Sequence, residues 1–106
     1  LIKDMPQALD YVIIEADGAK HHSLKYPAAD EPVIYPGTTD VIIVLGTWEK
    51  GRSCKDVVFR YELMQKELGT AEDAVVDDSV IDTLRQVYVR KLRDSGFEGR
   101  ISTYFI

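Results

Sequence analysis

Two uninterrupted runs of aliphatic residues constrain the fold of this chain more than any other feature. They are "YVIIEA" at residues 11–16 and "DVIIVLG" at residues 40–46. Apolar and polar residues do not alternate in either run, which is typical of strands buried on both faces of a helix-covered parallel sheet. A third strand is predicted for "RISTYFI" at residues 100–106, which stays apolar to its last residue.

Helical spacing of apolar residues predicts two helices between the second and third strands. The first, in residues 54–69, carries a stripe of Val57, Tyr61, Met64 and Leu68, with Val58 beside it. The second, in residues 77–96, carries a stripe of Val80, Leu84, Val87, Tyr88 and Leu92. Ser53 is suited to cap the start of the first helix and Gly69 its end, while Asp77, Asp78 or Ser79 can cap the second, which Gly96 closes.

The order of these elements predicts a three-layer α/β fold, with a mostly parallel sheet and flanking helices. Residues 29–40, "ADEPVIYPGTTD", are expected to form an ordered loop, because they contain two prolines and a glycine. Three parallel strands are few for such a sheet. We therefore expect residues 1–106 to be a single α/β domain that is a fragment of a longer chain.

Composition excludes several classes of function. The net charge of -5 argues against a nucleic-acid binder, which needs a basic surface. The longest apolar run, residues 41–45, is far too short to cross a membrane. Cys54 is the only cysteine, so the chain forms no internal disulfide, which fits a reducing cytoplasm. We expect Cys54 to be structural, since no histidine lies near it in sequence.

Two acids lie at the carboxyl end of the first predicted strand, where open parallel sheets bind their ligands. Phosphate-handling enzymes place such acids there to hold Mg²⁺, so Glu15 and Asp17 are candidates for metal and catalytic roles. Gly18 would let the backbone approach a terminal phosphate closely. The alternative is that the acids only cap a turn made by Asp17 and Gly18.

The glycine-rich loop that would grip the phosphates of a P-loop nucleotidase is not found in this sequence. Residues 46–51, "GTWEKG", have glycines at the right spacing, but Arg52 and Ser53 follow in place of the Lys-Ser/Thr pair. If the protein is a nucleotidase, we expect its phosphate loop before Leu1. This chain alone should then not hydrolyse nucleotide efficiently.

Residues 10–46, "DYVIIEADGAKHHSLKYPAADEPVIYPGTTDVIIVLG", resemble the signature stretch of the selenium-dependent hydroxylase accessory proteins, the YqeC-like family. The matching pieces are Glu15 to Ala19, Leu24 and Lys25, Pro27, Glu31 to Ile34, Pro36, and the strand that ends at Gly46. The likeness continues loosely through residues 60–62. Two positions depart from the family pattern, because Asp30 and Phe59 stand where the family usually has histidine.

The resemblance implies a P-loop nucleotidase fold that works with Mg²⁺ and ATP or GTP. It implies an accessory role in the maturation of a molybdenum hydroxylase, which would be the client partner. Glu15 and Asp17 would serve Mg²⁺ and the attacking water, and the Gly18 amide would sense the terminal phosphate. The loop of residues 25–36 would respond to the nucleotide or touch the client. The alternative is a non-catalytic module that binds a partner or cofactor.

Several further residues are candidates, each with an ordinary alternative. Lys25 and Arg60 are suited to contact phosphate, but Lys25 can equally be a solvated loop lysine, and Arg60 a helix-surface residue or a partner of Glu31 or Glu15. Glu31 can orient water or metal, or only brace the loop that contains Pro27 and Pro32.

The remaining expectations concern the two histidines and the tryptophan of the chain. His21 and His22 are adjacent in sequence and point different ways, so they are expected to be exposed and not to chelate a metal. Trp48 is expected either to line the cleft at the strand ends or to anchor the core.

Overall fold

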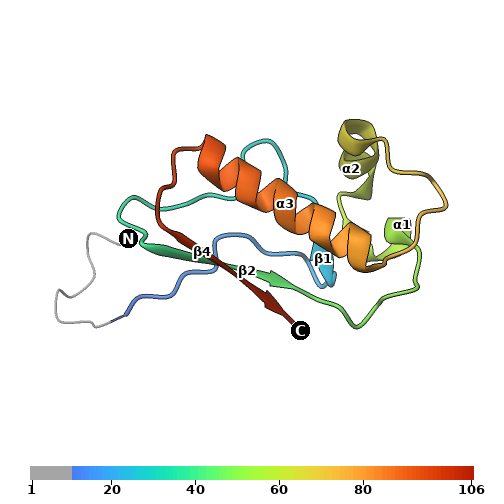
Figure 1. The fold of residues 1–106 in the computed structure, drawn as a ribbon, viewed down its shortest axis with the longest axis horizontal. Coiled ribbons are helices and arrows are strands. Elements are labelled where there is room, and N and C mark those ends of the chain that lie inside the picture. The colour runs from blue at the N-terminus through green and yellow to red at the C-terminus, as the bar shows by residue number, and fades with distance from the viewer. Residues whose placement is uncertain (1–10) are drawn as a thin grey trace.

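The computed structural model describes residues 11–106, and its secondary structure is mixed (Figure 1). In chain order the elements are β1 (Leu24–Lys25), β2 (Asp40–Leu45), α1 (Cys54–Val57), β3 (Val58–Phe59), α2 (Tyr61–Leu68), α3 (Asp78–Asp94) and β4 (Arg100–Phe105). None of these helices combines the length and apolar character that a membrane crossing requires.

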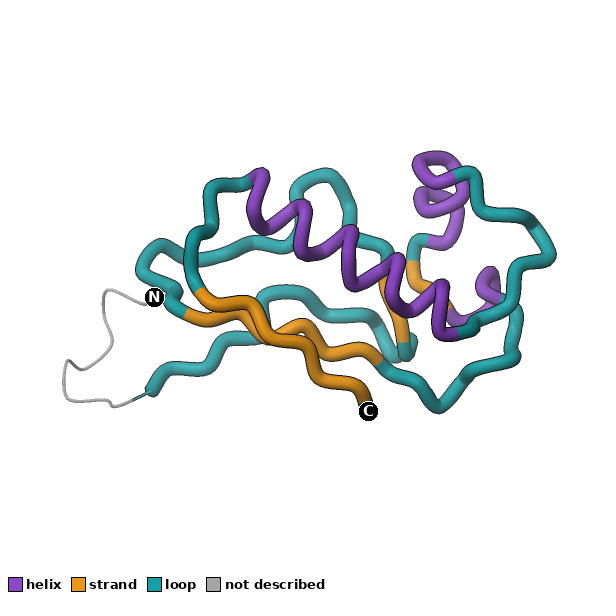
Figure 2. Tube along the Cα trace, viewed as in Figure 1, coloured by secondary structure: helices purple, strands orange, loops and turns teal. Residues whose placement is uncertain are grey.

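The larger sheet pairs β2 with β4 in parallel, in a register that sets Ile43 opposite Thr103. Helix α3 runs across this sheet (Figure 2). Ile43 and Leu45 are buried in the core, whereas Ile42, Val44 and Tyr104 are exposed. The strands expected at residues 40–46 and 100–106, and their parallel pairing, are therefore confirmed. The expected third layer is not found among residues 11–106, because only one face of this sheet is covered by a helix.

A second, smaller sheet pairs β1 with β3 in parallel, with Leu24 opposite Val58 and Lys25 opposite Phe59. Within the described part of the chain, the two sheets are separate, so the single three-stranded sheet predicted from sequence is wrong. The chain is a small α/β protein with two short parallel sheets. Leu24 and Val58 bring the smaller sheet into the hydrophobic core.

The helix predicted for residues 54–69 is divided into α1 and α2. Val58 and Phe59, which are β-branched and aromatic, form β3 between them, and Arg60 adopts a left-handed backbone with φ 65°. The helical stripe was misleading because Val57, Val58, Tyr61 and Met64 are all buried without sharing one continuous helix. Gly69 does end α2 in the left-handed conformation, but the Ser53 side chain makes no capping hydrogen bond.

Helix α3 confirms the second predicted helix. The Asp77 carboxylate caps its start by accepting a hydrogen bond from the Val80 amide at 2.8 Å. Leu84 and Leu92 of the predicted stripe are buried, as is Ile81, which the predicted stripe left out. Fully burying such aliphatic side chains stabilises a fold by roughly 1.5–3 kcal/mol each, so α3 is a main support of the core.

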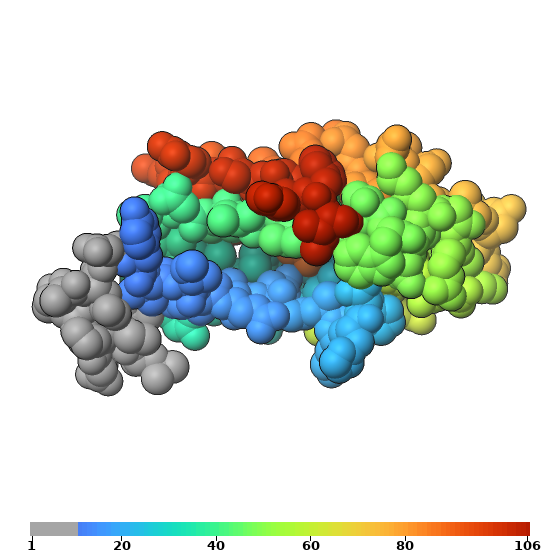
Figure 3. All heavy atoms as spheres, turned by 90° about the horizontal axis from the view of Figure 1, so that it is seen from below, coloured from blue at the N-terminus to red at the C-terminus, as the bar shows by residue number. Residues whose placement is uncertain are grey.

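The strand predicted for residues 11–16 is not formed. Tyr11 and Ile13 are 86% and 95% exposed, and no described strand pairs with this segment. An aliphatic run becomes a strand only when a neighbouring strand satisfies its backbone amides and carbonyls, and in residues 11–106 β2 is paired with β4 and with no other strand. In the space-filling view the segment, in blue, lies on the surface beside the green residues of β2 (Figure 3).

The backbone contact at the end of β2 explains why residue 46 is a glycine. The Gly46 amide donates a hydrogen bond to the Ser23 carbonyl at 3.2 Å, and a Cβ at this position would lie 2.8 Å from the same oxygen. Only glycine permits this close approach of the two backbones. Trp48 lies against Gly46 but is 64% exposed, so the prediction that it anchors the core is wrong.

Candidate functional site

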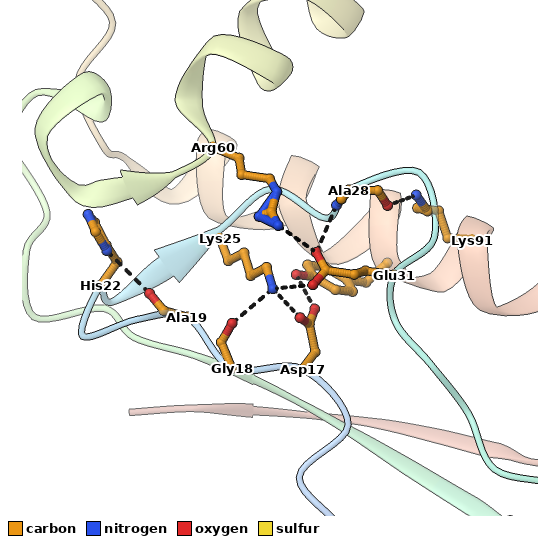
Figure 4. A network of polar contacts seen from close by, with 10 residues as sticks. Asp17, Gly18, Ala19, His22, Lys25, Ala28, Glu31, Arg60 and Lys91 are labelled. Atoms are coloured by element: carbon orange, nitrogen blue, oxygen red, sulfur yellow. Dashed lines mark hydrogen bonds and ion pairs between the residues drawn. The ribbon is translucent and has the colours of Figure 1, made fainter.

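Lys25 is the centre of the most connected polar cluster in the described structure. Strand β1 directs its side chain inward, where it is 6% exposed (Figure 4). Its ammonium forms an ion pair with Asp17 and donates hydrogen bonds to the Gly18 carbonyl at 2.8 Å and to Glu31 Oε2 at 2.9 Å. Lys25 is therefore not a solvated loop lysine, and it joins two segments that the sequence analysis singled out separately.

The protonation of this cluster follows from its geometry. Burial alone would lower the pKa of Lys25, but hydrogen bonds to Asp17 and Glu31 outweigh it, and the net shift is upward. Burial alone would raise the pKa of Glu31, but the Ala28 amide and Lys25 outweigh it, and the net shift is downward. Both groups are thus held in their charged forms near neutral pH.

Tyr88 adds a contact that the sequence analysis missed. Its hydroxyl, on helix α3, donates a hydrogen bond to Asp17 Oδ2 at 2.9 Å across 71 positions of sequence. Burial and the Asp17 charge raise the pKa of Tyr88, so the hydroxyl keeps its proton and remains a donor. The predicted helical stripe included Tyr88 only as an apolar residue, and no local pattern indicates its polar partner.

Glu31 braces the loop that follows β1. Its Oε1 accepts a hydrogen bond from the Ala28 amide at 3.0 Å and lies 3.8 Å from Arg60 Nη2. The Ala28 carbonyl in turn accepts a hydrogen bond from Lys91 of α3 at 2.5 Å (Figure 4). Of the alternatives for Arg60, the structure shows the pairing with Glu31, and of those for Glu31 it shows the bracing of the loop.

Glu15 and Asp17, the two acids of the sequence motif, lie in different environments. The Asp17 side chain is 11% exposed and is bonded to Lys25 and Tyr88. Glu15 is exposed, and its carboxylate makes no ion pair or hydrogen bond with another residue in the 11–106 range. Gly18 is exposed next to it, and its amide donates to no described residue.

The carboxylate oxygens of Glu15 and Asp17 determine whether the motif can hold Mg²⁺, which prefers oxygen ligands. Both Asp17 oxygens already accept hydrogen bonds, one from Lys25 and one from Tyr88. No group of three or more histidine, cysteine or acidic side chains within residues 11–106 is arranged to hold a metal ion. Glu15 therefore fits as a single carboxylate ligand, whereas Asp17 fits only a contact that leaves its present partners in place.

The loop residues proposed for partner contact differ in accessibility. Pro27 is fully buried and Pro32 is half-buried, so Pro27 does not present a side chain to a partner in this structure. Val33 and Tyr35, in the same loop, are 54% and 36% exposed. Sequence analysis placed residues 25–36 together but did not separate the buried part of the loop from its exposed part.

The remaining candidates lie outside this cluster or at its edge. His21 and His22 are exposed, as expected. Cys54 is buried, and burial raises the pKa of its thiol, in agreement with a structural role. A hollow of about 350 Å³ at the end of β4 is lined by Thr47, Lys50, Asp78, Ile81, Asp82 and Phe105, none of which the sequence analysis named as a site residue.

Comparison with known proteins supplies the family. No curated protein matches this chain, and no solved structure does. The family described as YqeC protein matches residues 1–62, more than half of the 106 residues. The matched range contains the Glu15–Gly18 motif, Lys25, Glu31 and Arg60, and it confirms the resemblance on which the sequence analysis relied. The chain belongs to the YqeC protein family.

Proposed function

We propose that the protein containing this chain is a nucleotide-dependent accessory protein for the maturation of a selenium-dependent molybdenum hydroxylase. In this proposal residues 15–18 form its acidic element for Mg²⁺ and water. One observation supports it above the others: Asp17 and the Gly18 carbonyl are bonded to the buried Lys25, while Glu15 and Gly18 are exposed residues whose carboxylate and amide have no partner in residues 11–106. Lys25 thus positions Asp17 and Gly18, and the exposed Glu15 is an oxygen donor of the kind that a nucleotide-bound metal requires.

The residues divide into three roles under this proposal. Glu15 would hold Mg²⁺, which when bound neutralises charge on the phosphates of ATP or GTP. The Gly18 amide would donate to the terminal phosphate, and Asp17 would orient water without leaving Lys25 and Tyr88. Lys25 acts as a positioning residue, because its ammonium already has three oxygen partners. Arg60, whose ion pair with Glu31 is long at 3.8 Å, is the better candidate to reach phosphate.

The client enzyme would be touched by the exposed part of the loop. Val33 and Tyr35 offer apolar and aromatic surface, and they follow Glu31, which is bonded to Lys25. A change at the Glu15–Gly18 motif would reach this loop through Lys25, since one ammonium contacts both segments. This connection is a physical route by which nucleotide state could be sensed by a partner.

A second candidate function is favoured by a different observation. Asp17 and Glu31 both serve the Lys25 cluster, which is what a non-catalytic partner- or cofactor-binding module would show if its acids only shape loops. In that case Glu15 is a surface acid without a ligand. The two functions differ in whether the full-length protein binds nucleotide at all.

Calorimetry on the full-length protein with Mg²⁺ and a non-hydrolysable ATP or GTP analogue separates them. We expect Glu15→Gln to weaken binding about tenfold, the loss of one charge-assisted contact, with an unchanged melting temperature. Glu62→Gln, an exposed acid on α2, is the matched control and should bind as the parent does. Absence of binding in the parent protein would refute the nucleotide proposal and leave the binding module, whereas equal binding in Glu15→Gln would remove the proposed role of Glu15.

A further inference from the structure

The ring of Phe59 gathers several basic groups in a chain whose net charge is -5. The Lys20 ammonium lies 5.7 Å from the ring centre, the Lys25 ammonium 5.6 Å and the Arg60 guanidinium carbon 4.7 Å. The His22 ring centre lies 5.4 Å from that of Phe59. Cations are attracted to an aromatic ring within about 6 Å, but this attraction does not replace the hydrogen bonds that a buried cation needs. We call Lys20, His22, Phe59 and Arg60 the Phe59 cluster.

Arg60 is the member whose hydrogen-bonding capacity is unused. A guanidinium carries five N–H donors, yet Nη1 is buried without any partner among residues 11–106. The nearest carboxylate oxygen, Glu31 Oε1, is 3.8 Å from Nη2, too far for a hydrogen bond, and it already accepts from the Ala28 amide. A buried donor without an acceptor is costly and rare in folded proteins. Arg60 therefore has an unsatisfied donor for which residues 11–106 supply no acceptor.

The charges of the neighbours indicate what kind of acceptor fits. Lys25 pairs with Glu31 at 2.9 Å and also with Asp17, so it reduces the repulsion of an anion by Glu31 near Arg60 without cancelling it. Lys20 is exposed and adds a second positive charge on the same ring. A planar guanidinium binds two oxygens of one oxyanion side by side, and a doubly charged phosphate gains more from an Arg and Lys pair than a carboxylate does.

His22 is held in a fixed orientation at the edge of this cluster. Its Nδ1 lies 3.2 Å from the Ala19 carbonyl and 3.0 Å from the Lys20 carbonyl. Since both neighbours are acceptors, we assign the hydrogen to Nδ1, and Nε2 is left for another partner. The exposed His22 ring thus presents a polar atom beside the Phe59 ring.

We propose that the Phe59 cluster binds a phosphate group, with Arg60 as its anchor and Lys20 as its second cation. This inference rests on the proposed function only for the source of the phosphate, which would then be the nucleotide. Lys25 connects the two places, because its ammonium contacts the Gly18 carbonyl and also lies over the Phe59 ring. A phosphate at Arg60 is therefore adjacent to the motif that carries Glu15.

Calorimetry with inorganic phosphate, pyrophosphate and the Mg²⁺ complex of a non-hydrolysable nucleotide tests the proposal on the full-length protein. We expect Arg60→Gln to weaken pyrophosphate binding at least tenfold and Lys20→Gln about threefold, as expected for a bidentate contact and a single exposed charge. Arg60→Lys keeps the charge without the planar fork and should fall between the parent and Arg60→Gln. Arg100→Gln, an exposed arginine on β4, is the matched control and should change nothing.

Thermal unfolding checks that each variant is folded. If Arg60→Gln does not fold, Lys20→Gln still tests the inference, because Lys20 is exposed. Loss of pyrophosphate binding in the Arg60 and Lys20 variants supports the inference, even where the parent binds no nucleotide and the proposed function fails. The inference is overturned if folded Arg60 variants bind all three probes as tightly as the parent does, even where Glu15→Gln still weakens nucleotide binding. A parent protein that binds neither phosphate nor pyrophosphate at millimolar concentration overturns it as well.

Discussion

Replacing Lys25 with methionine is the sharpest test of the polar cluster. Methionine keeps much of the length of the side chain but removes the charge that Asp17 and Glu31 share. Asp17 would keep only the Tyr88 hydroxyl, and Glu31 would keep the Ala28 amide. The variant therefore leaves two carboxylates, 11% and 23% exposed, near one another without the cation between them.

The expected cost can be worked from this geometry. Removing one partner of a buried ion pair destabilises a protein by roughly 3–5 kcal/mol. Both carboxylates can still reach water, which places Lys25→Met near the lower end, at about 3 kcal/mol. Small proteins have about 5–15 kcal/mol of stability in all, and 1 kcal/mol shifts the melting temperature by about 4–8 °C at this size. The melting temperature should therefore fall by roughly 12–24 °C.

Urea unfolding followed by circular dichroism measures this cost. Lys50→Met is the matched control, because Lys50 is 47% exposed and pairs with an 86% exposed Asp78; its cost should stay below about 0.5 kcal/mol. The double variant Lys25→Met with Asp17→Asn should recover part of the loss, since fewer charges are left unpaired. Equal costs for the two lysine variants would refute the buried cluster.

Three other predictions concern Tyr88, Cys54 and Glu31. Tyr88→Phe should lose about 1.5 kcal/mol of unfolding free energy, the value of a hydrogen bond to a charged acceptor, whereas the exposed Tyr104→Phe should lose almost none. The Cys54 thiol should resist alkylation at pH 8 until urea unfolds the protein, because it is buried and its pKa is raised. Folding lowers the pKa of Glu31, so the stability that its charged form contributes is lost as the pH falls below about 4.5 and through the folded pKa. The urea midpoint of the parent should therefore fall over this pH range, and that of Glu31→Gln should depend less on pH.

Sequence patterns predicted the elements that depend on local chemistry. Helix α3 was recovered with its Asp77 cap and buried Leu84, and strands β2 and β4 with their parallel direction. Periodicity failed where pairing across the chain decides the backbone. Residues 58–59 fit a helical stripe but form a strand with β1, and residues 11–16 have strand composition but no strand beside them that shares its hydrogen bonds.

The candidate site was predicted by residue type but not by geometry. Lys25, Glu31 and Arg60 were named because of their chemistry and their places in the motif, and the structure brings all three together. Tyr88 could not be found this way, because its contact with Asp17 joins positions 71 residues apart and depends on how α3 lies over the chain. The burial of Lys25 was equally hidden, since a lysine between leucine and tyrosine carries no local sign of which way it points.

The two acids of the motif show how a shared signature can divide into different physical roles. Asp17 and Glu15 are separated by one residue, yet one has both oxygens bonded within the protein and the other faces solvent. A charge that is already paired gains less from a metal than an unpaired one, because binding must first break existing hydrogen bonds. Substitutions should therefore separate the two: Asp17→Asn acts first on stability, and Glu15→Gln acts first on ligand binding. Only Glu15 then reports on the nucleotide without also reporting on the fold.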